Sequence, residues 1–429
     1  MRRMHQAEPH TGELFPEDPA PAPDAGPIVP TLEAARARMA AVRPSAYART
    51  RNALDGAVSG LSPYITHGFV SLTDVLRSAH ARHPLDVQHK FVYELGWRAF
   101  FRHVWQHRGD DILRSLHAGP LPDHAYVQTL PDDIRQGATG VPVVDMAVRE
   151  LYATGTLHNH ARMWLASYVV HLRKVHWRAG ADWLYAHLLD GDIASNHLSW
   201  QWVAGTGSSK PYLFNAENVA RYAPPAWHSP GTVVDASYAS LDLLARQPDG
   251  GLAAQPHARV DGTGVYEPAL LSSPPAQPGI TEPDATMVNG RDVWLVHPWS
   301  LGDLPLGLPP DTVVIGLFLS DFHRTWPWSV HRWRFVADRM AALADVCWHG
   351  DSASVGAALS GARRVRSLAE PHLAPWLPGL SACLPAPKLF PPVDQPCASF
   401  SQWWRRATRG LDTSADLLAA SGQHDVDAA

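Results

Sequence analysis

The feature that most constrains this chain is the stretch from residue 137 to residue 215, where helical apolar patterning carries polar side chains that a core rarely accepts. Apolar residues recur at intervals of three and four, and the turns Thr154-Gly155 and Ala179-Gly180 interrupt them, a spacing that predicts packed helices. Buried polar groups need a partner or a ligand. We therefore expect an ion pair between Asp190 and Arg162 and a large polar ligand held between helices. The other groups that point to such a ligand are Asp192, Asn196, Trp200 and Trp202.

The order of patterns along the 429 residues predicts two folded domains. A Pro- and acid-rich tail without periodicity, expected to be disordered, covers 1–30, and helical patterning follows over 31–247. A Pro/Gly-rich linker is predicted for 248–290. Short β-branched runs at Val293–Val296, Val313–Leu319, Asp345–His349 and Arg364–Leu368 alternate with helical segments over 291–392, which predicts a small parallel α/β domain. Residues 393–429 are assigned to a C-terminal segment and tail, so the predicted fold is mainly α, with a helical domain followed by the α/β domain.

Composition excludes several classes of protein. No run of about 18 apolar residues is long enough to span a bilayer, and the N-terminus lacks the apolar core of a secretory signal, so we expect a cytoplasmic protein without membrane contact. The three cysteines lie far apart with no CxxC, which argues against disulfides and zinc ribbons. His158 and His160 on one helix would point about 200° apart, so we expect no metal site there.

Five short motifs occur in a fixed order, and together they resemble the FAD-binding half of the DNA photolyase/cryptochrome family over roughly residues 44–225. They are Ser59-x-Leu61-Ser62-Pro63-Tyr64, Glu94-x-x-Trp97-Arg98, Thr139-Gly140-x-Pro142-x-x-Asp145, Thr154-Gly155-x-x-His158-Asn159-x-x-Arg162-Met163 and Asp190-Gly191-Asp192-x-Ala194-x-Asn196-x-x-x-Trp200-Gln201-Trp202. The resemblance implies an all-helical FAD-binding domain, FAD as cofactor, DNA containing pyrimidine dimers as partner, and a monomer.

The resemblance also implies roles for individual residues. Those that would bind the cofactor are Tyr47, Ser59, Leu61, Ser62, Phe91, Arg98, Asn159, Arg162, Asp190, Asp192, Ser195 and Asn196. Asn196 would face flavin N5, where a neutral amide can tune the redox chemistry. The pocket for a flipped dimer would consist of Glu94, Trp97, Asn159, Met163 and Trp202. Glu94 and Asn196 are assigned to catalysis, and Trp200 and Trp177 to the electron chain that photoreduces the flavin.

Three departures from the family pattern stand out. Thr156 occupies a place where the family usually has Trp, and the outermost place of the tryptophan chain falls near His124, with Tyr126 as the nearest oxidisable substitute. The usual N-terminal antenna domain is missing. The C-terminal α/β segment resembles that domain, relocated and shortened, and Ser399–Ala407 resembles the segment that leads from it into the helical half. An unrelated α/β module is the alternative, and a second chromophore is not readable from the sequence.

The resemblance implies repair of cyclobutane pyrimidine dimers in blue light, by an electron from excited, reduced FAD. Enzymes for (6-4) photoproducts resemble a His-His pair at this position. This chain has His158-Asn159, as enzymes for cyclobutane dimers do, which favours cyclobutane dimers. A cryptochrome-type light sensor is the alternative, favoured by the linker and the displaced α/β domain; a flavoprotein that only binds nucleic acid is a third. The net charge is −5, but residues 31–225 carry 20 Lys and Arg against 16 Asp and Glu, so phosphate contacts would come from that half. Lys210 and His160 are the candidates.

Overall fold

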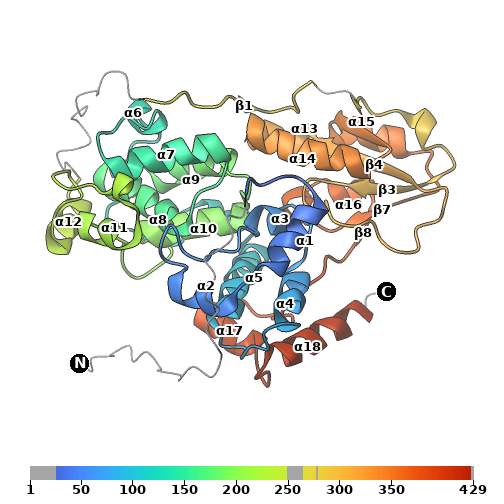
Figure 1. Ribbon diagram of the computed structural model, residues 1–429. Coiled ribbons are helices and arrows are strands. Elements are labelled where there is room, and N and C mark those ends of the chain that lie inside the picture. The colour runs from blue at the N-terminus through green and yellow to red at the C-terminus, as the bar shows by residue number, and fades with distance from the viewer. Residues whose placement is uncertain (1–25, 249–263, 277–278, 427–429) are drawn as a thin grey trace.

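The computed structural model describes residues 26–248, 264–276 and 279–426 (Figure 1). Most of the predicted N-terminal tail and part of the predicted linker lie outside these residues. The first half of the chain is helical, as expected. Its helices are α1 (Leu32–Ala40), α2 (Pro44–Thr50), α3 (Ser62–Thr66), α4 (Leu72–His80), α5 (Lys90–Arg108), α6 (Asp132–Arg135), α7 (Pro142–Thr154), α8 (Asn159–Ser167), α9 (Trp177–His187), α10 (Ile193–Ala204), α11 (Ala216–Tyr222) and α12 (Tyr238–Ala245).

The second half forms a six-stranded parallel sheet, which confirms the predicted α/β class. The strand order is β2 (Ile280–Thr281), β6 (Val346–Gly350), β4 (Val313–Leu319), β3 (Asp292–Val296), β7 (Arg364–Leu368), β8 (Ala382–Leu384). All four predicted strands are confirmed to within one residue. Every residue of β3 and β4 is buried, as in a sheet covered on both faces. Together with α13 (Ser320–Thr325), α14 (Val330–Leu343), α15 (Ser352–Leu359) and α16 (Leu377–Leu380), this sheet is called the α/β layer below.

The chain reverses its direction of progress across the sheet between β3 and β7. It runs from β3 to β4 to β6 on one side and then continues with β7 and β8 on the other. In open α/β sheets such a reversal leaves a crevice beyond the carboxyl ends of the two neighbouring strands, and ligands commonly bind there. Here these strand ends face the helical half.

Two short strands lie inside the predicted linker. β2 pairs with β6 at one edge of the sheet, and β1 (Leu270–Leu271) pairs antiparallel with β5 (Trp328–Ser329). A strand of two residues forms because a partner strand lies beside it, and it has no apolar pattern of its own. The sequence therefore did not indicate these strands. The exact domain boundaries remain a prediction.

The hydrophobic core does not follow the division into a helical and an α/β half. One cluster of buried side chains joins α3–α5 to the sheet and to the C-terminal helix α17 (Phe400–Ala407), and a second cluster fills the space among α7–α12. Helix α10 contributes Leu198 to the first cluster and Val203 to the second. Figure 1 shows α10 between the two groups of helices, so a helix with apolar residues on both sides connects the cores.

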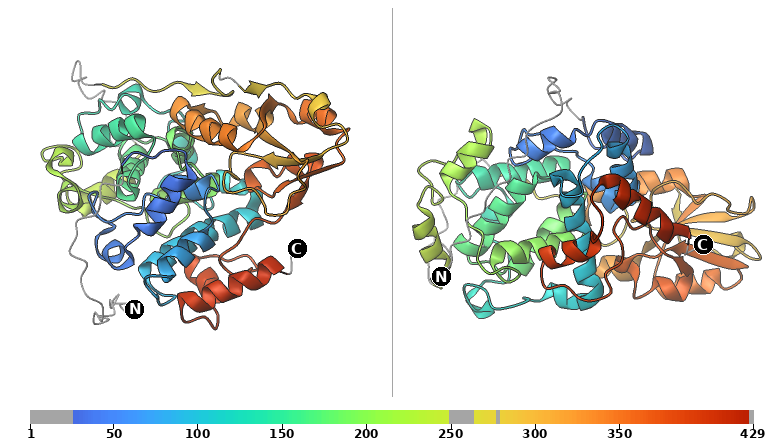
Figure 2. Two further views of the ribbon diagram at one scale, coloured as in Figure 1. Left: turned by 45° about the vertical axis from the view of Figure 1, so that its right-hand side comes forward. Right: turned by 90° about the horizontal axis from the view of Figure 1, so that it is seen from below.

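The C-terminal segment returns to the first helices of the chain. Helices α17 and α18 (Ser414–Val426) pack against α5 and α4 (Figure 2). The amphipathic pattern of α17 was visible in the sequence, but the segment predicted as a polar tail is helical over most of its length. Trp403 and Trp404 of α17 are both buried, which attaches this segment firmly to the core.

Candidate functional site

The acidic loop, Leu188 to Asp192, connects α9 to α10 and lies at the centre of the predicted site. The predicted ion pair is confirmed: an Nη atom of Arg162, on α8, lies 2.9 Å from each carboxylate oxygen of Asp190. Burial raises the pKa of Asp190, but the Arg162 charge and the bonds from Arg162 and Ser62 outweigh it, so this pKa lies below its usual value. Asp190 is therefore a buried anion held by α3 and α8.

Arg98 points from α5 toward the same loop. One Nη donates to the Thr66 hydroxyl and the other to the Ser62 hydroxyl, each at 3.0 Å. Among the described residues, none forms an ion pair with Arg98, although Asp190 and Asp192 lie close enough to raise its pKa against the lowering effect of burial. A half-buried guanidinium whose direct partners are hydroxyls retains donors for an anionic ligand.

Asp192 starts helix α10. One carboxylate oxygen accepts the backbone N–H of Ser195 at 2.8 Å, and the other lies 2.6 Å from an Nη atom of Arg102. The hydroxyl of Ser195 is buried and has no partner among the described residues. A buried hydroxyl of this kind fits a site that a polar ligand completes. Asp192 itself fixes the first turn of α10, and its direct contact with a cofactor remains a prediction.

Asn196 and Trp200 project from α10 onto α9. The amide nitrogen of Asn196 donates to the Ala181 carbonyl at 2.8 Å, which orients the side-chain oxygen away from that bond. A Cβ atom on Gly180 would lie 2.4 Å from the Trp200 ring, so the glycine is required where the indole approaches the helix. The two predicted functional side chains thus have fixed positions against neighbouring backbone.

An aromatic path leads outward from Trp177. Trp177 is buried, and its indole centroid lies 5.7 Å from the His176 ring, which lies 6.2 Å from Tyr126. Burial raises the pKa of Tyr126 to about 12, and its ring is half-buried, whereas His124 is exposed. The arrangement favours Tyr126 over His124 for the outermost place of the electron chain. Electron transfer along this path remains a prediction.

The residues predicted to bind the dimer are exposed or partly buried. The amide of Asn159 is 3.6 Å from the Met163 sulfur, so the two share a face of α8. Trp202 is 41% exposed, and Glu94 forms an ion pair with Arg51 at 3.3 Å. Trp97 instead stacks on Phe400 of α17, with centroids 4.0 Å apart and planes at 14°, so one face of its indole is covered by the C-terminal segment.

The remaining predicted cofactor residues have the following surroundings. Tyr47 packs edge-on against Phe91 at 5.4 Å, and burial raises the pKa of the Tyr47 hydroxyl. Ser59 is half-buried and its hydroxyl accepts the backbone N–H of Leu61 at 3.4 Å. Leu61 belongs to the hydrophobic core. The contact of these residues with a cofactor stays a prediction.

The argument from helix geometry about His158 and His160 is wrong. His158 precedes α8 as its N-cap and is not part of the helix, and the two rings lie parallel with centroids 6.1 Å apart. His160 also stacks on Tyr222 at 5.2 Å, and burial lowers its pKa. Both facts argue against His160 as a charged contact for DNA phosphate. Among the residues that the structure describes, no three His, Cys, Asp or Glu side chains gather as metal ligands do.

Four residues near the acidic loop were missed by the sequence analysis: Arg102, Arg332, Glu370 and His372. Arg102 lies one helical turn after Arg98, and this spacing was a usable signal. The other three belong to the α/β layer, and nothing in their local sequence points to the acidic loop.

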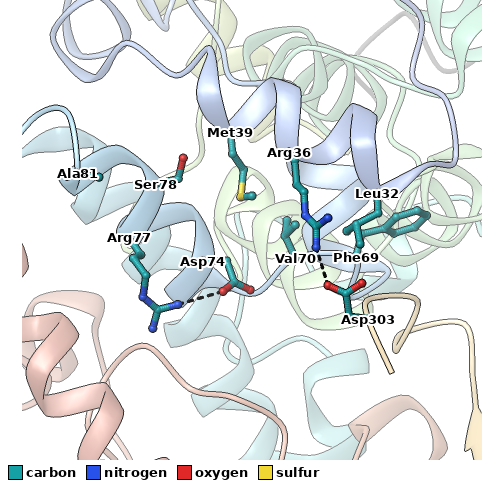
Figure 3. A pocket seen from close by; sticks show the side chains of 10 residues that line it. All are labelled: Leu32, Arg36, Met39, Phe69, Val70, Asp74, Arg77, Ser78, Ala81 and Asp303. Atoms are coloured by element: carbon teal, nitrogen blue, oxygen red, sulfur yellow. Dashed lines mark hydrogen bonds and ion pairs between the residues drawn. The ribbon is translucent and has the colours of Figure 1, made fainter. Parts of the chain in front are cut away.

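A separate cavity of about 380 Å³ lies between α1 and α4 (Figure 3). Its floor is apolar, and ion pairs of Arg36 with Asp303 and of Arg77 with Asp74 lie at its rim. None of its lining residues belongs to the predicted site. No helix in the described part of the chain is both long and apolar enough to cross a membrane.

Comparison with known proteins identifies the helical half. Residues 91–226 match the family described as the FAD binding domain of DNA photolyase. The deoxyribodipyrimidine photo-lyase of Streptomyces griseus is 38% identical over 155 residues, which are 35% of this chain and 33% of that protein. The enzyme of the same name from a strain of Thermus thermophilus is 38% identical over 213 residues, 48% of this chain and 49% of that one.

Relatives described as cryptochromes are also similar. Cryptochrome DASH of Synechocystis sp. is 34% identical over 172 residues, 38% of this chain and 35% of that protein. Among solved structures, the Synechocystis cryptochrome aligns with a TM-score of 0.40 and 32% identity over 44% of this chain and 43% of the other. The chain thus spans about half, or less, of the length of these relatives. The family match itself covers residues 91–226, which lie in the helical half.

Proposed function

We propose that this chain, whose residues 91–226 match the FAD binding domain of DNA photolyase, is a member of the DNA photolyase and cryptochrome family and repairs cyclobutane pyrimidine dimers in DNA in blue light. The observation that carries this proposal is the group of polar residues around the acidic loop, which matches the needs of a bound FAD. When bound and reduced, FAD supplies the light-driven electron that splits the dimer.

The residues present fit such a cofactor. Arg98 has donors to spare beside Ser62, as a diphosphate requires, and the unpaired Ser195 hydroxyl offers a further bond. The amide nitrogen of Asn196 donates to the Ala181 carbonyl. Its side-chain oxygen is thus left to accept a hydrogen bond from an N–H group of the reduced flavin ring. Arg98 would hold the diphosphate of FAD, Ser195 its ribose region and Asn196 the edge of the flavin ring.

The surroundings of Glu94 support repair. Burial raises the pKa of this carboxyl, and nearby Arg51 lowers it by less. When it carries a proton in the complex with DNA, Glu94 would donate to a dimer carbonyl as negative charge builds on it, which is the differential stabilisation that a catalyst needs. The exposed Trp202 and the Asn159–Met163 face provide the apolar and amide contacts that suit a flipped base pair.

The test starts from the purified protein, which should be yellow and should release FAD on denaturation. Reduced protein and a dimer-containing oligonucleotide are then exposed to blue light, with a dark sample as control. Glu94→Ala should lower the repair rate by up to about 100-fold, whereas Glu217→Ala, an exposed acid on α11, should not. A colourless protein that takes up no added FAD would refute the cofactor, and a yellow protein without repair would refute the activity.

Contact with DNA phosphate is proposed for Lys210, which is exposed and follows the helix that carries Trp202. Each phosphate contact steepens the salt dependence of duplex binding by about 0.9 log units per log unit of salt. Lys210→Ala should reduce this slope by about that amount. Binding that is weak, insensitive to salt and equal for damaged and undamaged duplex would argue against repair.

A light sensor of cryptochrome type is the second candidate. The observation that favours it is the shared core of α3–α5 and the sheet, because a change at the flavin could reach the α/β layer through it. Flavin photochemistry without repair of either single- or double-stranded substrate would support this alternative. The origin of the α/β layer as a relocated antenna domain, and any second chromophore in it, remain predictions.

A further inference from the structure

Arg332 of the α/β layer reaches the acidic loop although it lies 141 residues beyond Gly191 in the sequence. It stands in the first turn of α14 and is completely buried. One Nη donates to the Tyr185 carbonyl at 3.1 Å and the other to the Gly191 carbonyl at 2.6 Å. Tyr185 lies in the last turn of α9, where carbonyls lack helical partners and a cation is favourable.

Arg332 and the Tyr185 carbonyl together restrict the residue that the loop can have at position 191, because a Cβ atom there would lie 2.6 Å from that carbonyl oxygen. A Cβ atom there would lie 2.4 Å from one Nη of Arg332, a separation that real side chains do not reach. The guanidinium stacks over the Trp328 ring at 4.0 Å, so it cannot withdraw without losing this contact. Arg332 therefore joins the end of α9 to the middle of the acidic loop.

A second connection runs through Glu370 and His372, which follow strand β7. The carboxylate of Glu370 lies 2.8 Å from Arg102, and Arg102 in turn lies 2.6 Å from Asp192. His372 donates from Nδ1 to Glu370 at 2.5 Å and accepts the backbone N–H of Ile193 on Nε2 at 3.3 Å. These contacts form a closed ring from Asp192 through Arg102, Glu370 and His372 back to the first residue of α10.

The ring occupies the crevice where a parallel sheet usually binds its own ligand. Trp299, which follows β3, stacks on His372 with centroids 4.3 Å apart and planes at 13°. His297, also after β3, contacts the carbonyl of Leu368 at the end of β7 at 2.9 Å. Side chains of the chain itself thus fill the space between β3 and β7, and they face the acidic loop.

A network of this kind is a poor way to gain stability, since removing charges from water costs about as much as their pairing returns. Its best attested use is to fix one geometry among alternatives. Both connections end on the backbone or carboxylates of the acidic loop and on the first turn of α10, the helix that carries Asn196 and Trp200. We propose that the α/β layer is an integral part of the FAD site: Arg332, Glu370 and His372 position the acidic loop and α10 for the cofactor.

This inference rests on FAD binding by the helical half, but not on DNA repair. Arg332, Glu370 and His372 are positioning residues, because they act through the loop and Arg102 rather than on the cofactor. For outer partners of metal ligands, loss of one contact costs about 10–100-fold in affinity, and a similar loss is expected here. The Kd for FAD, measured by quenching of flavin fluorescence on the apoprotein, should rise by about that factor in Arg332→Met and Glu370→Gln.

A matched control is Arg363→Met. Arg363 belongs to the same layer and pairs with Asp292 and Asp311 at the surface. Asp292 is the first residue of β3, at the end of the strand opposite the acidic loop. This variant should keep the wild-type Kd. An unchanged Kd in both Arg332→Met and Glu370→Gln would overturn the proposal, as would an equal rise in Arg363→Met.

Hydrogen exchange separates positioning from general loss of structure. In Glu370→Gln, which preserves the shape of the side chain, amides of residues 188–196 should exchange faster while those of β4 keep their protection. Loss of protection throughout the sheet would show a merely structural role and overturn the proposal. In the wild type, coupling is reciprocal, so FAD should slow exchange at residues 370–373 as well. If FAD slows exchange only in the helical half, the connection is refuted even if the protein repairs DNA. If the changes in Kd and exchange are present but repair is absent, only the proposed activity is refuted.

Discussion

Two buried histidines predict that mild acid destabilises this protein. His171 is fully buried; its Nε2 lies 2.9 Å from the Val203 carbonyl and its Nδ1 has no partner among the described residues. Burial lowers its pKa to about 4. His103 is nearly buried, its Nε2 lacks a partner among those residues, and burial with the charges of His107 and Arg406 lowers its pKa to about 4 as well. Both rings are therefore neutral in the folded protein at neutral pH.

The direction of the effect follows from proton uptake. In the unfolded chain each ring has a pKa near 6.5, so between about pH 6.5 and pH 4 the unfolded state binds protons that the folded state does not. The stability contributed by each neutral ring is complete above pH 6.5 and is lost as the pH falls toward 4. Between pH 7 and pH 5 the loss is about 2 kcal/mol for each histidine, or about 4 kcal/mol for the two.

Urea unfolding at pH 7 and pH 5, followed by circular dichroism, measures this difference. His171→Gln keeps a donor for the Val203 carbonyl and cannot titrate, so it should remove about 2 kcal/mol of the pH dependence. His83→Gln, at an exposed site, should remove none. A free energy of unfolding that is equal or larger at pH 5, or a His171→Gln variant with the full wild-type pH dependence, would refute the reasoning.

Three further predictions concern the site. Arg162→Met removes the ion-pair partner of the buried Asp190 carboxylate, so the free energy of unfolding, measured in urea, should fall by about 3–5 kcal/mol. A change below about 1 kcal/mol would mean that the pair is solvated. Asn196→Ala should alter the flavin spectrum and reduction potential with FAD still bound, whereas Asn159→Ala should lower only the repair yield; equal loss of FAD from both would contradict these separate roles. Trp200→Phe should abolish photoreduction but not repair by chemically reduced protein, and Tyr126→Phe should slow photoreduction; normal photoreduction in the first variant would place the electron entry elsewhere.

Local patterns were sufficient for most of the fold. Continuous β-branched runs predicted β3 and β4 because both faces of these strands are buried. Helical spacing predicted the packed helices of the stretch from residue 137 to residue 215. These features depend on residues a few positions apart, so the sequence displays them directly.

Part of the site was also predictable for a chemical reason. A charged group in an apolar helical stretch requires compensation, and Arg162 was the basic residue available to Asp190, as the structure confirms. The same reasoning failed for His158 and His160, since the angle between them depends on where α8 begins, and the helix begins at Asn159. One residue at a helix end decides whether two side chains diverge or stack.

Tertiary structure alone decided what surrounds these residues. The stacking of Phe400 on Trp97 and the contacts of Arg332 with the acidic loop join segments separated by more than a hundred residues. Such contacts depend on how the sheet and the C-terminal helices pack against α5 and α10, and periodicity carries no information about that packing. The sequence alone therefore determined which residues carry charge and which elements present them, because these are local properties. The α/β layer became part of the site only through packing, because the carboxyl ends of β3 and β7 meet the acidic loop in space and nowhere along the chain.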